Sequence, residues 1–526
     1  MTEGADRLDR ISDYLKKNAA EIPDAPATRH NGETLTYQQL DEKVDACAKA
    51  LIANSIGRGD CVATLCSPCP DFLITFLAAA SIGAVWLGLN PKYTPAEYEY
   101  VISDAKPKII FLRSQIGSRH YLDEFEALSN QAIEAFKMVL LDPDASAQRQ
   151  VVGYQDFVVD GYAVSPENLR EVRQGVSPSD AALLVYTSGT TGKPKGALLP
   201  HRGLVTCCKV QARYWRADPV RILNFLPINH VGCVGDISSF ILVCGGCNIF
   251  MEQFDAKGSL KAIAEERVTI WGGIPTTIQM TLDVPDFADF DLSSVQLIAW
   301  SGAPASTTLI ERMQQVTENL STSYGLTETV GSVTYVPPGS SFEHLSQTIG
   351  QVPSEYEVKL IDAEGGEVDP GCEGEICVRG DFIMLGYLNR PEATDEAIDK
   401  DGWLHTGDVA IKRADGLFEL VGRKKEMFKS GGYNVYPREI EIALESHPSI
   451  AMAAVIGVPD PVFSEVGYAF VLPEVGQNPT ARDLVDHCRK TLANYKVPKS
   501  FVIENTLPLL PIGKIDKPAL KARLKA

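Results

Sequence analysis

The sequence predicts an α/β protein: a large N-terminal domain of helix-covered sheets plus a β-barrel-like piece, with a small mobile α+β C-terminal domain. Up to about residue 304, apolar β-forming runs alternate with helical patterns, as in parallel sheets covered by helices. From about Ile349, short strands separated by Gly and Asp turns replace this pattern. After Arg423, one helix and two strands begin a compact α+β unit. We therefore expect domains at residues 1–424 and 425–526.

Length and charge limit the function classes. The chain has 526 residues, which is more than one typical domain. Its net charge of -19 argues against nucleic acid as a partner, although a local basic pocket for a small phosphate ligand stays open. The first 24 residues contain acids throughout and no apolar run, which is unlike a signal peptide. We expect a cytoplasmic protein.

A strand is expected at "CVATLC" (61–66), followed by a helix within "DFLITFLAAASIG" (71–83). The uncharged run Phe72–Leu89 is close to the length of about 18 residues at which a spanning helix is considered. Gly83 and the change to β-formers in "AVWLGL" instead predict a buried helix over 72–82 followed by a strand. We expect no membrane span, while peripheral membrane contact and a homo-oligomer stay open.

The later elements follow the same logic. A helix is expected at "PAEYEYVISDA" (95–105), and strands at "PKIIFL" (107–112), "VTIWGGIP" (268–275) and "VQLIAWSGAP" (295–304). The antiparallel or barrel-like piece is expected to contain "YEVKLID", "GEICVRG" and "DGLFELVGR". The final unit is expected to contain the helix "PREIEIALESHP" and the strands "IAMAAVIGVPD" and "YAFVLP".

The twelve cysteines include two CxxC pairs, Cys66/Cys69 and Cys244/Cys247, which together could form a zinc site. Both pairs adjoin apolar, strand-like runs, and free cysteine is among the most buried residue types. Buried thiols are therefore the favoured interpretation. A metal or redox protein is kept as an alternative that metal analysis would test.

The stretch "YTSGTTGKPKG" (186–196) combines three glycines, four aliphatic hydroxyls and two lysines, directly after the apolar run "AALLVY". Glycines let backbone N–H groups turn toward an anion, while hydroxyls and lysines add donors and charge. It is not a Walker loop, because Pro194 stands where that motif needs its second glycine. We expect a phosphate-binding loop made of Thr187, Ser188, Gly189, Thr190, Thr191, Gly192, Lys193 and Lys195.

This string resembles the AMP-binding signature of the adenylate-forming enzymes, which include acyl-CoA synthetases, luciferases and peptide-synthetase adenylation domains. The other motifs of that family have counterparts in the same order, and the resemblance runs from about residue 35 to the end of the chain. They are "LPINH" (226–230), "SGAP" (301–304), "SYGLTET" (323–329), "WLHTGD" (403–408), "GRKKEMFKSGGYNVYPREIE" (422–441) and "PIGKIDK" (511–517).

The resemblance implies a two-step reaction. ATP and a carboxylate give an acyl-adenylate and pyrophosphate, and the thiol of coenzyme A then takes the acyl group and releases AMP. The first step joins two anions, so it needs electrostatic stabilisation at the phosphate. The family pattern implies that Glu328 binds Mg²⁺, that Thr327 donates to the α-phosphate, and that Lys514 is the catalytic lysine.

The resemblance also implies how the nucleotide and coenzyme A are held. Tyr324 would stack on adenine opposite the backbone of "SGAP", and Asp408 would accept the ribose hydroxyls with Arg423 nearby. Lys425 would be the hinge about which the small domain turns. The implied adenine and ribose set is Gly302, Ala303, Pro304, Ser323, Tyr324, Gly325, Asp408 and Arg423; the implied loop facing coenzyme A is Lys429, Gly431 and Gly432.

The acyl pocket is expected around His230, which matches the aromatic gate of the "NH" motif. Its other expected residues are Val231, Gly232, Trp300, Val330 and Gly331. These residues are mostly small or apolar. None of the motifs contains an arginine placed to bind a second carboxylate of the substrate. We predict an apolar monocarboxylic acid: medium-chain fatty, alicyclic or aryl. Asp236 leaves an amino-acid substrate open, because relatives that activate amino acids carry an Asp near this point.

Two further classes stay open. A related enzyme could pass the acyl group to a carrier protein, to oxygen or to another acceptor, and AMP release with and without coenzyme A would discriminate. A non-catalytic nucleotide-binding module is the other class. The presence of both Glu328 and Lys514 weighs against it.

Overall fold

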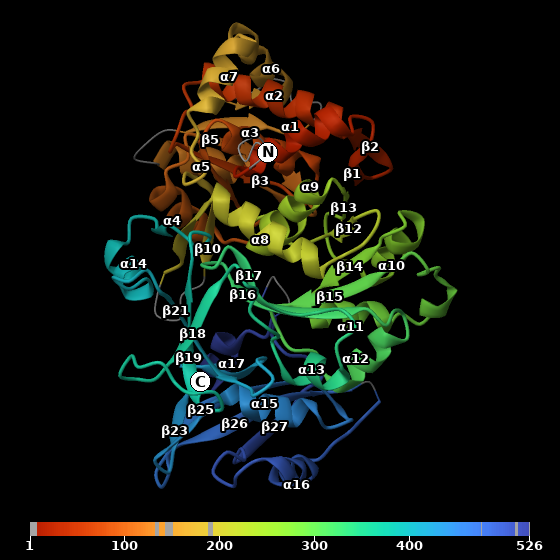
Figure 1. Ribbon diagram of the computed structural model, residues 1–526, viewed down its shortest axis with the longest axis vertical. Coiled ribbons are helices and arrows are strands. Elements are labelled where there is room, and N and C mark those ends of the chain that lie inside the picture. The colour runs from red at the N-terminus through yellow and green to blue at the C-terminus, as the bar shows by residue number, and fades with distance from the viewer. Residues whose placement is uncertain are drawn as a thin grey trace, which may run out of the picture.

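The computed structural model describes residues 8–131, 136–142, 151–187, 193–474, 476–510 and 514–524. Figure 1 shows the N-terminal helices at the top, two large sheets and an antiparallel sheet in the middle, and the C-terminal elements at the bottom. The order of elements follows the predicted change from alternating strands and helices to antiparallel strands.

The first large sheet has the strand order β20-β11-β10-β4-β3-β5-β8-β9. It runs parallel from β10 to β9, and β11 returns antiparallel to β10. Its strands are β3 (Cys61–Leu65), β4 (Val85–Gly88), β5 (Ile109–Leu112), β8 (Lys137–Leu140), β9 (Val151–Gly153), β10 (Ala181–Thr187), β11 (Lys195–Pro200) and β20 (Gly386–Tyr387).

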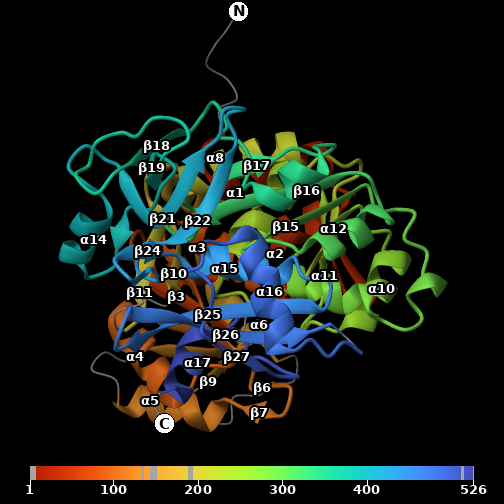
Figure 2. The same cartoon turned by 90° about the horizontal axis from the view of Figure 1, so that it is seen from below.

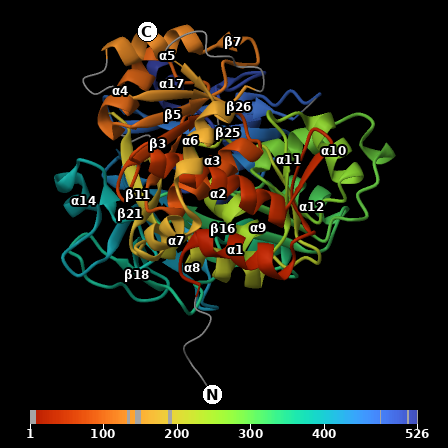
Figure 3. The ribbon, with the colours of Figure 1, turned by 90° about the horizontal axis from the view of Figure 1, so that it is seen from above.

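Helices cover both faces of this sheet, as buried parallel strands require. Val62, Trp86 and Phe111 pack against α2, α3 and α6 on one face, whereas Ala63 and Leu87 pack against α4 and α5 on the other. Figure 3 shows α2, α3 and α6 together on the upper side of the molecule. The helices of this half are α1 (Ile11–Glu21), α2 (Tyr37–Ala53), α3 (Pro70–Ser81), α4 (Pro95–Ala105), α5 (Leu122–Gln131), α6 (Tyr154–Asp160), η1 (Gly161–Ala163) and α7 (Pro166–Gln174).

The apolar run 72–89 is a buried helix followed by a strand, as predicted. Helix α3 has Pro at its first position, and the chain turns at Gly83 with φ +78° before β4 begins. A left-handed φ favours glycine, which explains the break in the run. Within the described ranges, no helix is long and apolar enough to cross a membrane.

The second large sheet has the order β17-β16-β15-β14-β12-β13-β1-β2. Its strands are β1 (Pro26–His30), β2 (Glu33–Thr36), β12 (Arg221–Asn224), β13 (Cys247–Phe250), β14 (Ile270–Gly273), β15 (Leu297–Ser301), β16 (Leu320–Leu326) and β17 (Gly331–Val336). Its helices are α8 (His201–Tyr214), the π-helix η2 (Gly232–Ser239), α9 (Phe240–Cys244), α10 (Ala256–Glu265), α11 (Pro275–Leu282), η3 (Phe287–Asp289), α12 (Thr307–Gln314) and α13 (Phe342–Gln347). Side chains of α8, η2 and α9 pack on one face, and those of α10 to α13 pack on the other.

The antiparallel piece predicted after Ile349 is a four-stranded sheet with the order β18-β19-β21-β22. Its strands are β18 (Glu357–Ile361), β19 (Glu373–Arg379), β21 (Leu404–Lys412) and β22 (Phe418–Arg423), and helix α14 (Pro391–Ala397) precedes β21. A short two-stranded sheet, β6 (Gln115–Ile116) with β7 (Arg119–His120), lies in the first half of the chain.

The C-terminal elements form an α+β unit with its own core, seen in blue in Figure 2. They are β23 (Phe428–Ser430), β24 (Tyr433–Val435), α15 (Pro437–Glu445), β25 (Ile450–Asp460), β26 (Ser464–Pro473), α16 (Ala481–Thr491), β27 (Ser500–Ile503) and α17 (Lys517–Arg523). Its sheet is separate from the sheet that ends with β22. Residues 424–427 link the two sheets.

Candidate active site

The candidate site lies where several parallel strands end. Thr187 closes β10, Gly302 follows β15, and Tyr324 lies near the end of β16. In open α/β sheets, ligands bind in the crevice outside the carboxyl ends of the strands. The topology therefore places the predicted phosphate loop and the predicted adenine segments at the edge where a ligand is expected.

Asp408 organises the predicted ribose site. It is 2% exposed, and its two carboxylate oxygens accept hydrogen bonds from different elements. The Tyr324 hydroxyl donates to Oδ2 at 2.7 Å, and Nε of Arg423 donates to Oδ1 at 2.9 Å. Asp408 and Arg423 are paired across β21 and β22. The neighbouring carboxylate raises the pKa of Arg423, and burial raises the pKa of Tyr324.

Lys514 reaches this site from the small domain. An alanine Cβ at Gly302 would stand 3.2 Å from Cε of Lys514 and 3.6 Å from its Nζ. Gly302 has φ +84°, and Ala303 and Pro304 beside it are exposed. Burial and the charge of Arg423 lower the pKa of Lys514, while Asp408 raises it. The lysine therefore lies among the predicted nucleotide-binding residues.

Two other predicted adenine residues lie inside the fold. Ser323 is buried, and its hydroxyl accepts from the Ser332 hydroxyl at 2.9 Å. A side chain at Gly325 would collide with the carbonyl oxygen of Gly331 on the antiparallel neighbour β17. Glycine is needed at position 325 because the two backbones approach so closely.

The predicted phosphate end gathers around Glu328. Its Oε1 accepts from the Tyr387 hydroxyl at 2.7 Å and from the Thr187 hydroxyl at 3.5 Å. Nζ of Lys195 lies 5.0 Å from the centre of the Tyr387 ring, within cation–π range. Sequence reasoning missed Tyr387, which is brought here by the short strand β20 beside β11. A tyrosine in "LGYL" gave no signal by itself.

The remaining predicted phosphate residues are placed as follows. Lys193 is exposed, with Nζ 5.2 Å from the centre of the Tyr100 ring. Thr327 is in the turn between β16 and β17, and its hydroxyl makes no hydrogen bond to any described residue. Ser188, Gly189, Thr190, Thr191 and Gly192 lie outside the described residues.

The chemistry of this end fits a hard cation. Mg²⁺ favours one or two carboxylates together with phosphate oxygens. Glu328 supplies one carboxylate, and Tyr387 holds one of its oxygens by a hydrogen bond. Thr187 and Lys195 belong to adjacent, paired strands at the same place. Glu328 is the residue that would hold such a cation, with Tyr387 fixing one of its oxygens.

The predicted acyl residues flank the π-helix. The backbone N–H of Gly232 donates to Nδ1 of His230 at 3.0 Å, so a neutral imidazole carries its proton on Nε2. Burial, with a smaller contribution from Lys514, lowers the pKa of His230 to about 4. On the facing segment, a Cβ at Gly235 would lie 3.6 Å from the carbonyl oxygen of Val330. Val231, Gly232, Val330 and Gly331 thus lie on two packed segments.

Trp300 is not brought to His230. The indole is 1% exposed and packs with Leu309, Ile310 and Met313 of helix α12. Successive side chains of a strand point to opposite faces. Ala299, rather than Trp300, faces the cluster that contains the π-helix residue Ile237. Sequence reasoning placed the tryptophan near the site without knowing which face of β15 it occupies.

The predicted hinge and loop belong to the connection between the sheets. Lys425 lies in a three-residue turn, in which the N–H groups of Glu426 and Met427 both donate to the carbonyl of Arg423. Gly431 and Gly432 have φ +58° and +88°. Two successive positive φ values suit a tight hairpin turn. In this structure the backbone of this loop bonds to the small domain itself: Gly431 N–H to Phe463, and Lys429 N–H to Glu465.

Three of the four cysteines in the CxxC pairs are buried, and Cys244 is half-buried. All twelve cysteines are unpaired thiols, and Sγ of Cys66 lies 3.8 Å from Sγ of Cys69 in the core of the first sheet. Cys244 ends helix α9, and Cys247 begins strand β13 of the second sheet. Among the residues that the structure describes, no group of three or more His, Cys, Asp or Glu side chains is arranged to hold a metal ion.

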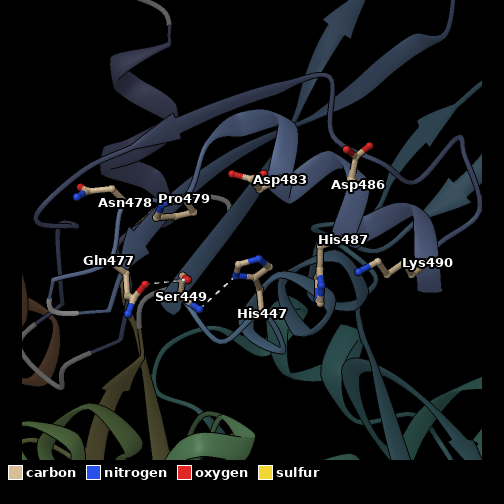
Figure 4. Close-up of a pocket in the computed structure, with 9 residues that line it drawn as sticks. All are labelled: His447, Ser449, Gln477, Asn478, Pro479, Asp483, Asp486, His487 and Lys490. Carbon is tan, nitrogen blue, oxygen red and sulfur yellow. Dashed lines mark hydrogen bonds between the residues drawn. The ribbon is translucent and has the colours of Figure 1, made fainter.

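A polar cleft on the small domain is a separate feature (Figure 4). Its polar groups already have hydrogen-bond partners nearby in the chain. Nδ1 of His447 accepts from the Ser449 N–H, and Asp483 belongs to the capping box at the start of helix α16. The ring nitrogen Nε2 of His487 lies 2.9 Å from the Ser446 hydroxyl. None of the predicted nucleotide residues lines this cleft.

Comparison with known proteins agrees with this geometry. The sequence model described as AMP-binding enzyme matches residues 15–388, and the one described as AMP-binding enzyme C-terminal domain matches residues 439–514. A feruloyl-CoA synthase from Amycolatopsis sp. is 35% identical over 98% of this chain and 99% of its own. A long-chain-fatty-acid–CoA ligase from Escherichia coli O157:H7 is 32% identical over 98% and 95%.

A solved structure, the amide bond synthetase McbA from Marinactinospora thermotolerans, superposes with a TM-score of 0.86. It is 27% identical to this chain and covers 98% of it and 99% of its own length. The two family models match successive parts of the chain, and both relatives and the superposed structure cover 98% of it. The chain therefore belongs to the AMP-binding enzyme family of adenylate-forming enzymes.

Proposed function

We propose that this enzyme is an AMP-forming acyl-CoA ligase. In the first step, an oxygen of the substrate carboxylate attacks the α-phosphorus of ATP, and pyrophosphate leaves as the acyl-adenylate forms. In the second step, the thiol of coenzyme A attacks the acyl carbon, loses its proton, and expels AMP. The observation that carries the proposal is the position of Lys514 beside Gly302, within the electrostatic reach of Asp408 and Arg423.

The roles of the side chains follow from charge. Two anions meet in the first step, so a fixed cation aimed at the developing charge gives a large part of the acceleration. Lys514 supplies that cation from the small domain. Glu328, held by Tyr387, would bind Mg²⁺ at the phosphate end. Thr187, Lys193 and Lys195 would hold the leaving pyrophosphate together with residues 188–192.

We further propose two domains, residues 1–424 and 425–526, with Lys425 as the hinge. The boundary falls inside the turn between the separate sheets that end with β22 and begin with β23. Lys514 and the Lys429–Gly432 loop lie on the same small domain. With Lys514 in the site, that loop is bonded to Phe463 and Glu465. Rotation about Lys425 would exchange the two between the half-reactions and bring Lys429, Gly431 and Gly432 toward coenzyme A.

The proposed substrate is a monocarboxylic acid with an apolar body: medium-chain fatty, alicyclic or aryl. The segments that would surround it, Val231–Gly235 and Val330–Gly331, have small or apolar side chains. The relatives named for feruloyl and long-chain fatty acyl groups act on acids with large apolar parts. An aryl or extended alkyl acid is therefore expected to react faster than acetate.

The alternative is an enzyme that transfers the acyl group to an acceptor other than coenzyme A. It is kept because the amide bond synthetase has the same fold over nearly its whole length. The discriminating experiment is AMP release by the purified enzyme with ATP, Mg²⁺ and a panel of alkyl and aryl acids, with and without coenzyme A. Release that depends on coenzyme A and on the acid supports the ligase. Adenylate formation without any response to coenzyme A, together with turnover on amines or a carrier protein, would replace it.

A further inference from the structure

Asp236 is the only residue of the π-helix η2 that has a carboxyl side chain. It lies in the middle of η2, between the buried residues Gly235 and Ile237. Its backbone carbonyl accepts from the Gln211 side chain. Its carboxyl group has no hydrogen-bond partner or ion-pair partner in the described part of the chain. A half-buried carboxyl without a partner is costly, so its retention needs an explanation.

The surroundings of this carboxyl are apolar or weakly polar. Gly331 faces it so closely that an alanine Cβ there would lie 2.7 Å from Oδ1. The thiols of Cys207 and Cys208 and the phenol of Tyr335 are the ionisable groups near it. No cation offsets the burial, which raises the pKa of Asp236 to about 7.

Asp236 nevertheless keeps accessible surface, whereas its chain neighbours on the helix do not. The buried residues Gly235 and Ile237 flank it and Gly331 faces it, so this surface opens into a recess between η2 and the start of β17. The recess adjoins Gly331, which is three residues after Glu328. It also adjoins the segment Val330–Gly331 that packs on the π-helix.

The same helix links Asp236 to the reaction centre. His230, just before η2, feels the charge of Lys514, whereas Asp236 is six residues further along. The hydrogen bonds of a π-helix join residues five apart, so Asp236 lies about one helical turn beyond His230. An acid with its carboxylate at Lys514 would therefore bring its opposite end toward Asp236 if its body has the length of an arylalkanoic or arylalkenoic acid.

We propose that Asp236 selects acids that carry a neutral hydrogen-bond donor, a hydroxyl or ring N–H, at the end remote from the reacting carboxylate. This inference rests on the proposed ligase function. Such a donor would satisfy the carboxyl, whereas a wholly apolar tail would bury it unpaired. An ammonium group would add its own desolvation cost in this apolar recess.

The test uses matched acids that differ only at the remote end. The probes are 4-hydroxycinnamate against cinnamate and 4-fluorocinnamate, with 4-(aminomethyl)cinnamate as the cationic probe. Initial rates of CoA-dependent AMP release at pH 8 give kcat/KM for each. We expect 4-hydroxycinnamate to exceed cinnamate by roughly 10- to 100-fold, the value of one hydrogen bond to a charged group.

Three variants separate selection from disturbance of the helix. Asp236→Leu should remove the difference in kcat/KM between 4-hydroxycinnamate and cinnamate, because leucine accepts no hydrogen bond. Asp236→Asn should keep part of the preference, because an amide still accepts a hydrogen bond. Ser239→Ala is the control for disturbance of the helix: it removes a hydroxyl that bonds to Val234 within η2, and it should change kcat/KM for both acids alike and keep their ratio.

The outcomes distinguish the two claims. Equal kcat/KM for the hydroxylated and plain acids in the natural enzyme, or a preference that survives Asp236→Leu, overturns the role of Asp236 and leaves the ligase function standing. A preference for the aminomethyl acid over the hydroxyl acid overturns the neutral donor. Absence of CoA-dependent AMP release with these acids and with alkyl acids overturns the ligase function and this inference together. If Asp236→Leu does not fold, Asp236→Asn and the wild-type ratios decide.

Discussion

At the scale of single residues, the structure adds a tyrosine to the predicted site. The Tyr387 hydroxyl bonds to the Glu328 carboxylate at 2.7 Å, and Lys195 lies over its ring. Tyr387 is far from the phosphate loop in the sequence and belongs to a two-residue strand. We infer that it is a positioning residue, because it touches the carboxylate and has no described contact of its own with the predicted nucleotide residues Tyr324, Asp408 or Arg423.

Tyr387→Phe should weaken the response to Mg²⁺ more than it weakens folding. The ring and its packing remain, but one oxygen of Glu328 loses the bond that orients it. A hydrogen bond to a charged group contributes about 1.5–3 kcal/mol, so adenylation should slow by roughly 10-fold or more. ATP–pyrophosphate exchange measured against Mg²⁺ concentration should show a raised Mg²⁺ requirement.

The control for this variant is Tyr121→Phe. It removes a buried hydroxyl that donates to Pro91, with no bond to Glu328. If both variants shift the Mg²⁺ dependence equally, Tyr387 does not act through Glu328.

Lys514→Ala should block adenylate formation and spare the second step. The ammonium lies beside Gly302 and close to Asp408 and Arg423, where phosphate charge would develop. Losing one such stabilising group commonly costs about 10²–10³ in rate. Adenylation is measured by exchange of pyrophosphate, and thioester formation is measured from supplied acyl-AMP.

Lys521→Ala on the exposed side of α17 is the matched control for loss of a lysine from the same domain. Adenylation near the wild-type rate in Lys514→Ala would remove this lysine from the mechanism.

The sequence predicted some residues of the site correctly but could not show which way others point. Tyr324, Asp408, Arg423 and Lys514 lie in contiguous motifs, and the structure brings them together. Trp300 shows the limit: its neighbours in the sequence suggested the site, but the alternation of β15 turns the indole into the core with α12. The face of a strand that is buried on both sides cannot be read from an unbroken apolar run.

At the scale of elements, the strands and helices with long apolar runs were predicted well. The split of 72–89 into α3 and β4, the start of α15 at Pro437, and strands β5, β14 and β15 follow from Gly and Pro signals and β-forming composition. The antiparallel strand β11 and the short β20 were not predicted, because their pairing is set by segments distant in the sequence. The π-helix was not predicted either.

The π-helix depends on contacts that no local pattern encodes. Side chains of Ser238 and Ser239 donate to carbonyls five residues earlier, Cys233 and Val234. Asn224 of β12 also donates to the Cys233 carbonyl. Such turns occur often at functional sites. Here the wide helix carries Asp236 against Gly331. Gly331 has φ +151° and no room for a side chain. A larger residue there would strain the backbone as well as narrow the expected acyl pocket, so its effect on substrate choice could not be assigned to pocket size alone.

Asp236 should make the stability of this element depend on pH. Burial raises the pKa of its carboxyl from 3.8 to about 7. Between about pH 4 and pH 7, the folded protein keeps a proton that the unfolded chain releases, so this stabilisation is present below pH 4 and is lost as the pH rises to 7. Burial also raises the pKa of the facing groups Cys207, Cys208 and Tyr335, so they stay protonated across this range.

Asp236→Asn removes this titration. Relative to the variant, the natural protein should lose about 3 kcal/mol of unfolding free energy between pH 4.5 and pH 7.5, because each pKa unit corresponds to about 1.4 kcal/mol. Urea denaturation of both proteins at several pH values measures the difference. Parallel stability profiles would show that the Asp236 carboxyl titrates normally.

At the scale of the whole molecule, residues far apart in the chain meet at one place. The large domain supplies the strand ends with Gly302, Tyr324 and Asp408, and the small domain brings Lys514 to them. Figure 2 shows the C-terminal elements lying across the large domain. This is the arrangement that we expect for the first half-reaction. The second half-reaction requires a thiol to approach the acyl carbon, and the hairpin with Gly431 and Gly432 is then the part of the small domain that we expect to face it.

Lys425→Pro should separate the two half-reactions. The turn at 424–426 is closed by two hydrogen bonds to the carbonyl of Arg423, donated by Glu426 and Met427. Proline at 425 removes neither bond and fixes φ near roughly -65°, a value found in helical turns. It should therefore tolerate the arrangement with Lys514 in the site and resist the rotation that follows.

We expect adenylation in this variant to stay within a few-fold of the natural rate, and thioester formation from supplied acyl-AMP to fall by about 10²-fold or more, as when a positioned reactant is misplaced. Proline also restricts Lys424, so circular dichroism and thermal unfolding must confirm that the domain stays folded. Lys425→Ala is the control, since it removes the charge and keeps the backbone free; it should run both steps. If a folded Lys425→Pro protein slows both steps equally, or slows neither, the hinge lies elsewhere. Only a pivot at this turn would let the backbone angle at residue 425 control the second step alone.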